Sequence, residues 1–152
     1  METPLNIYRN GNALNKELER LTKAKISQRN KGAIRRYGKH QLANNVSIQR
    51  VARISMGIRT LAVKLGQDFE SAKKADIEAL ISMLNQDKDY SPATVSDFKQ
   101  IIKQFYKFLK GNGEEYPREV KWIKTAIKLN HRKRFEELIR PEEIKNVLYC
   151  CD

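Results

Sequence analysis

The 152-residue sequence has few of the residues that mark an enzyme or a disulfide-bonded protein. Its two cysteines, Cys150 and Cys151, are adjacent, so they form neither a CxxC pair nor a disulfide framework. Its two histidines, His40 and His131, are far apart in the sequence, and common phosphate-binding and hydrolase motifs are missing. We therefore expect no catalytic residue, no metal site and no cofactor in this chain.

Long apolar runs are also missing. No stretch approaches the roughly 18 apolar residues that a membrane-spanning helix needs. The N-terminal residues lack the apolar core of a secretory signal. The sequence therefore predicts a cytoplasmic protein that does not enter a membrane.

Acidic residues are scarce relative to basic ones. Eighteen Asp and Glu residues face thirty Lys and Arg residues, which gives a formal net charge of +12. Between residues 16 and 64, Glu17 and Glu19 are the only acids, whereas acids outnumber bases between 66 and 90. A clustered basic region is typical of nucleic-acid-binding proteins. Charge alone also permits binding to a membrane surface or to the ribosome.

The apolar residues recur with the period of an α-helix, and no segment alternates as a strand would. The length suits one domain with a hydrophobic core. The sequence predicts helices over 13–24, 28–45, 47–65, 72–86, 91–110 and 117–127, and a last helix from 141. The predicted fold class is all-α.

The helix predicted over 91–110 carries two stripes. One stripe is apolar, and the other, called here the lysine stripe, contains Ser96, Lys99, Lys103, Lys107 and Lys110. Neighbouring like charges on a helix destabilise it by about as much as opposite charges stabilise it, ~0.2–0.5 kcal/mol per pair. We therefore infer that negative charge from outside the chain faces the lysine stripe.

The helix predicted over 47–65 has a comparable row beside its apolar face. The row consists of Arg50, Arg53, Gly57, Thr60 and Lys64, at alternating intervals of three and four residues. Because Gly57 has no side chain, a phosphate or a neighbouring helix can approach closely there, and the pattern does not distinguish between the two.

The start of the helix at 91 is polar. Ser91 and Thr94 lie where backbone N–H groups have no helical partner, so they can cap the helix or help to hold a phosphate. Capping is the simpler role for Ser91, and phosphate binding is our interpretation of Thr94.

Five segments of the chain resemble one protein family when they are taken in order. They are ISQRN (26–30), DIEAL (76–80), YSPATVSDFKQIIKQFYKFLKG (90–111), EEYPREVKWIKT (114–125) and LIRPEEIKNVL (138–148). The set resembles the N-terminal core-binding domain of tyrosine recombinases, the phage integrase and Xer-like family, particularly its archaeal branch. The resemblance implies a SAM-like bundle of about four core helices plus flanking helices, which forms one half of a clamp on duplex DNA.

The resemblance also implies a domain division. We expect an N-terminal extension with a short helix (1–25), a DNA core-binding domain (26–127), a basic linker (128–140) and the first helix (141–152) leading into a catalytic domain that this chain lacks. HRKR (131–134) matches the family's HxxR pattern but lies too early, so we interpret it as part of the linker. The parent recombinase would act as a tetramer on two DNA sites.

In the family, the two helices that correspond to 47–65 and 91–110 meet the major groove. The expected DNA contacts are Arg50, Arg53, Thr60, Lys64, Ser91, Thr94, Ser96, Lys99, Lys103, Lys107, Lys121, Lys124, Arg132, Lys133 and Arg134. Among these, Arg50, Arg53 and Ser96 are predicted to contact bases. Neutralising about six phosphates would make log K fall with log salt at a slope of about −5.

A different class of function is open as an alternative. The chain could be a free-standing basic helical adaptor that binds RNA or a protein partner, with the basic rows as a solvated face. Such an adaptor would show no preference for duplex DNA.

Overall fold

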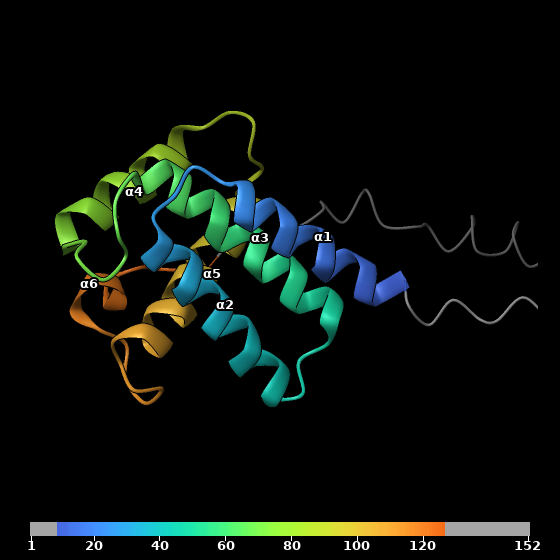
Figure 1. Ribbon diagram of the computed structural model, residues 1–152. Helices are drawn as coiled ribbons and strands as arrows, with labels where there is room; N and C mark the ends of the chain where they lie inside the picture. The colour runs from blue at the N-terminus through green and yellow to red at the C-terminus, as the bar shows by residue number, and fades with distance from the viewer. Residues whose placement is uncertain (1–8, 127–152) are drawn as a thin grey trace, which may run out of the picture.

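The computed structural model describes residues 9–126, which fold into a helical bundle (Figure 1). The helices are α1 (Arg9–Lys23), α2 (Gln28–Ala43), α3 (Ile48–Leu65), α4 (Lys74–Gln86), α5 (Pro92–Leu109) and α6 (Arg118–Lys121), and no strand occurs within 9–126. The predicted all-α class is confirmed. The predicted linker (128–140) and last helix (141–152) lie outside the described residues, as do both cysteines. None of the described helices is both long enough and apolar enough to cross a membrane.

Serine residues define where three of the helices begin. The side chains of Ser27, Ser47 and Ser91 each accept the backbone N–H three residues later, at the starts of α2, α3 and α5. Helix α3 ends at Gly66, whose φ of 70° is the left-handed conformation that favours glycine. These local signals explain why the helix bounds agree closely with the sequence pattern.

Helix α3 is the centre of the bundle and packs against α1, α2, α4 and α5 (Figure 1). Beside it, the rings of Phe69 and Phe105 meet edge to face with centroids 5.0 Å apart. The Tyr106 hydroxyl donates a 2.8 Å hydrogen bond to the Phe69 carbonyl, and burial raises the pKa of Tyr106. The core therefore contains one satisfied polar group among aromatic rings.

The connection after α3 is fixed by a buried amide. Asn30 of α2 accepts the Phe69 N–H at 3.0 Å and donates to the Gln67 carbonyl at 2.9 Å. Because a buried amide left without partners destabilises a fold, these two bonds hold the loop against α2. Asn30 is the last residue of the ISQRN segment.

Helix α1 lies in the segment predicted as an N-terminal extension, and it packs along α3 (Figure 1). Arg59 Nε of α3 donates to Glu17 Oε1 of α1 at 2.6 Å, and the Glu17 side chain is only 4% exposed. Lys31 Nζ of α2 donates to the Thr22 carbonyl at 2.8 Å. Charged side chains thus join α1 to both α2 and α3.

The helix predicted over 117–127 is wrong beyond its first turn. Helix α6 ends at Lys121, and residues 123–126 are not helical. The carbonyl of Ile123 accepts from Lys103 Nζ at 3.0 Å, and the carbonyl of Thr125 accepts from Ser96 Oγ at 2.6 Å. Side chains of α5 therefore occupy carbonyls on which a continuing helix would depend.

Candidate nucleic-acid interface

The lysine stripe of α5 finds partners within the chain. Besides its bond to Ile123, Lys103 lies 4.7 Å from the centre of the Tyr116 ring, and Lys107 lies 5.3 Å from the same centre. Lys110 Nζ donates to Glu119 Oε1 at 2.9 Å, and this bond lowers the pKa of Glu119. A carbonyl, an aromatic ring and a carboxylate therefore interact with three lysines that the sequence left without a counter-charge. Only Lys110 has a carboxylate of the chain as its partner, so the inferred external charge is not needed there, and the predicted contact of all three lysines with DNA stays a prediction.

Lys99 differs from the other lysines of the stripe. It is half-buried, and within residues 9–126 its side chain makes no hydrogen bond or ion pair. Lys121 and Lys124 are exposed on the segment that follows α5, whereas Arg132, Lys133 and Arg134 lie outside the described residues.

Four hydroxyl groups predicted to face DNA have partners in the bundle. Ser96 donates to the Thr125 carbonyl, and Thr60 donates to the Met56 carbonyl of its own helix at 3.0 Å. The hydroxyls of Ser91 and Thr94 lie 2.9 Å apart, and Ser91 also accepts the Thr94 N–H. Ser91 therefore caps α5, as the sequence predicted for it.

The row of Arg50, Arg53, Gly57, Thr60 and Lys64 on α3 has different surroundings along its length. Towards the end of α3, Lys64 Nζ lies 3.3 Å from Asp87 Oδ2 and 5.3 Å from the centre of the Tyr90 ring. In the middle, a Cβ on Gly57 would lie 2.9 Å from Ile101 Cδ1 of α5. Of the two readings left open, close helix packing is therefore the role that Gly57 has in the structure.

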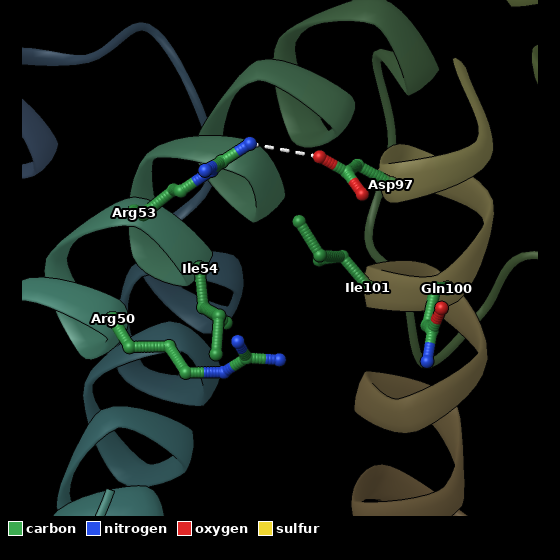
Figure 2. A pocket seen from close by; sticks show the side chains of 6 residues that line it. All are labelled: Arg50, Arg53, Ile54, Asp97, Gln100 and Ile101. Carbon is green, nitrogen blue, oxygen red and sulfur yellow. Dashed lines mark hydrogen bonds and ion pairs between the residues drawn. The ribbon is translucent and has the colours of Figure 1, made fainter. Parts of the chain in front are cut away.

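At the beginning of the row, a hollow of about 170 Å³ separates α3 from α5. We call it the α3–α5 hollow; its lining consists of Arg50, Arg53, Ile54, Asp97, Gln100 and Ile101. Figure 2 shows the guanidinium of Arg50 extending into the space between the helices, while Arg53 points to Asp97. Arg53 Nη2 donates to Asp97 Oδ2 at 2.8 Å. The Arg50 side chain has no such partner among the described residues.

Two larger hollows continue this one on either side. The first, of about 550 Å³ between α1 and α3, shares Arg53 and adds Lys16 and Arg20. The second, of about 320 Å³, shares Arg50 and Gln100 and adds Gln41, Gln104 and Tyr37, among others. Because the three hollows share lining residues, we refer to them together as the channel; the cations that line it are Lys16, Arg20, Arg53 and Arg50.

The channel has few acidic groups, and each of them is paired with an arginine. The lining contains two carboxylates, Glu17, which is buried against Arg59, and Asp97, which is bonded to Arg53. Burial raises the pKa of Tyr37 to about 12, so this phenol stays neutral at physiological pH. The exposed charge along the channel is thus mainly positive.

The sequence pattern missed Lys16, Arg20 and Gln100. Lys16 and Arg20 lie on a helix that was treated as an extension, and they reach the channel because α1 packs along α3. Gln100 and Gln104 lie one turn apart on α5, beside the lysine stripe, so their spacing could have indicated a second polar face.

Comparisons of the chain with protein-family models, with curated proteins and with solved structures find no match. Among the described residues, no group of His, Cys, Asp or Glu side chains is arranged to hold a metal ion. The functional assignment therefore depends on the chemistry of the channel and on the order of the sequence segments.

Proposed function

We propose that the chain is a duplex-DNA-binding module, the core-binding half of a tyrosine-recombinase clamp, and that the channel is the surface that meets DNA. The observation that carries this proposal is the set of four cations, Lys16, Arg20, Arg53 and Arg50, in three hollows that share lining residues. Clustered cations of this kind bind phosphates and release counterions. The order of the five sequence segments supports the recombinase family.

The proposal gives this chain no catalytic step. In a tyrosine recombinase the nucleophile and its arginines belong to the other half of the clamp. For the core-binding half by itself, we expect binding in the range of non-specific complexes, with a Kd of ~10⁻⁴–10⁻⁶ M at physiological salt.

The described surface favours duplex DNA over single-stranded RNA. Proteins that bind single strands stack bases on exposed aromatic rings. Among the described residues, the exposed large apolar side chains are all aliphatic: Leu42, Ile48, Met56, Val63 and Met83. The channel offers guanidinium and amide groups instead, which suit phosphates and the edges of paired bases.

The experiment is fluorescence anisotropy of the full chain with labelled duplex DNA and with single-stranded RNA, over a salt series. We expect tighter binding to the duplex and a log–log salt slope of about −4 to −5. The double variant Lys16→Ala, Arg20→Ala should make the slope less steep by about 2.

The matched control is Arg29→Ala, Arg36→Ala, which removes the same charge from α2 at positions that do not line the channel. Its slope should change by less than that of the first double variant. Equal binding to RNA and duplex DNA, or a slope that does not respond to the Lys16 and Arg20 changes, would contradict the proposal.

A further inference from the structure

The α3–α5 hollow combines groups of different hydrogen-bonding character in a small space. Arg50 supplies only donors, the Gln100 amide supplies both donors and an acceptor, and Asp97 supplies only acceptors. The side chains of Arg50 and Gln100 make no hydrogen bond to any described residue. The polar groups are thus available to a ligand that both donates and accepts.

This mixture suits a phosphate poorly. A phosphate group accepts hydrogen bonds and carries negative charge, whereas Asp97 offsets the charge of one of the two arginines in the lining. Arg53, the nearest cation to Asp97, is already held by that carboxylate at 2.8 Å. Lys16 and Arg20, further along the channel, suit phosphates better, because the carboxylate in the lining of their hollow, Glu17, is buried against Arg59 and lies 4.0 Å from Arg20.

The edges of base pairs do suit the mixture. In the major groove, purines present acceptors and, in adenine, a donor, which arginine and glutamine side chains can match in pairs of bonds. Cytosine presents an amino group that a carboxylate accepts. The hollow therefore has the complement of a base-pair edge and, with two arginines and one aspartate, less positive charge than the hollow of Lys16 and Arg20.

The remaining lining residues are apolar. Figure 2 shows Ile101 of α5 pointing toward Ile54 of α3, and both side chains are partly buried. An apolar patch beside polar groups in a groove-reading surface contacts the C5-methyl group of thymine. Uracil lacks this methyl group, so such a patch also distinguishes DNA from RNA.

We propose that the α3–α5 hollow reads a thymine next to a purine in the major groove, and that Asp97 excludes phosphates from it. Arg50 and Gln100 bind the purine edge, Ile54 and Ile101 contact the thymine methyl, and Asp97 keeps Arg53 from binding the backbone without sequence preference. This inference rests on the proposed function, because the channel must first meet duplex DNA.

The test begins with selection of tight-binding duplexes from a random pool by the full chain, followed by anisotropy with a selected and a scrambled duplex. We expect the selected sequences to share a thymine–purine step. Replacing that thymine by deoxyuridine should weaken binding to the selected duplex by about fivefold and leave the scrambled duplex unaffected.

Two variants then test the residues. Gln100→Ala should reduce the preference for the selected duplex by about tenfold with no change in salt slope. Asp97→Asn should tighten binding to the scrambled duplex, steepen its salt slope and reduce the preference. The control Asp89→Asn makes the same charge change in the exposed turn before α5 and should leave the preference intact.

The outcomes separate the two proposals. If the scrambled duplex binds with a steep salt slope but no sequence is enriched, or Gln100→Ala weakens all duplexes equally, the base-reading role is wrong and the DNA-binding function stands. If Asp97→Asn has the same effect as Asp89→Asn, the exclusion of phosphates is wrong. If no duplex binds, both proposals fail.

Discussion

Two groups of basic residues on this bundle have opposite surroundings. Lys103, Lys107 and Lys110 of α5 interact with a carbonyl, a ring and a carboxylate from the segment 116–123. In the α3–α5 hollow, by contrast, Arg50 has no partner among the described residues. In the sequence both groups are simply rows of like charge on amphipathic helices. The difference shows that a row of like charges on a helix indicates an external anion only after partners within the chain have been excluded.

Changes at Lys103 or Lys110, which have internal partners, should lower the free energy of unfolding and leave DNA binding intact. Changes at Arg50, a channel cation without a partner among the described residues, should do the reverse.

The largest effect on stability is expected at Arg59. Arg59→Met would remove the close partner of the buried carboxylate of Glu17 and leave only Arg20, 4.0 Å away, which costs about 3 kcal/mol of unfolding free energy. Urea denaturation followed by circular dichroism measures this loss. The control Arg36→Met breaks a mostly exposed pair with Glu70, at 3.6 Å, and should cost less than about 1 kcal/mol. Equal urea midpoints for the two variants would contradict this expectation.

The next effect is expected in binding. Arg50→Ala should weaken binding to duplex DNA by about tenfold, because it removes a guanidinium that the chain itself does not use. Its unfolding free energy should stay within about 0.5 kcal/mol of the wild-type value, as is usual for exposed positions. Anisotropy and urea denaturation on the same preparations give both quantities. A loss of stability with unchanged affinity would show that Arg50, like Lys103 and Lys110, serves the fold and not DNA binding.

A smaller effect depends on pH. Lys110 lowers the pKa of Glu119, so this carboxylate stabilises the fold above the ordinary carboxyl pKa and loses its effect as the pH falls through the lowered pKa. Glu119→Gln should therefore cost about 1 kcal/mol at neutral pH, and the difference from wild type should disappear in acid. Glu78→Gln, in an exposed pair with Lys74, is the control and should cost less than Glu119→Gln at neutral pH. A difference that grows in acid would have the wrong sign.

The finest distinction is between two lysines one turn apart on α5. Lys103→Met should lower stability by about 0.5–1 kcal/mol and leave the DNA salt slope unchanged, because Lys103 binds the Ile123 carbonyl. Lys99→Met should leave stability unchanged and make the slope less steep by about 1. If both variants change the slope equally, internal contacts do not keep Lys103 from DNA.

Much of the fold could be predicted from local signals. The apolar period and the serines at positions 27, 47 and 91 define α2, α3 and α5 almost to the residue, because capping and amphipathicity act within one helix. The pattern after Pro117 looked equally helical, since Val120 and Ile123 are both buried. It failed because side chains of α5, distant in sequence, bind the carbonyls of that segment.

The candidate site was predicted only in part, for a related reason. Arg50 and Arg53 share one helix face, so their row is visible in the sequence. Lys16 and Gln100 join them only when α1 and α5 pack on α3, and no local pattern records that packing. The internal partners of the lysine stripe were missed in the same way.

The bonds from α5 to the carbonyls of Ile123 and Thr125 also close loops in the chain. Lys103 and Ser96 reach these carbonyls across 20 and 29 residues of sequence. The entropic cost of closing a loop rises slowly with its length, by about 0.6 kcal/mol for each doubling. The longer of the two loops therefore costs only about 0.3 kcal/mol more to close than the shorter one.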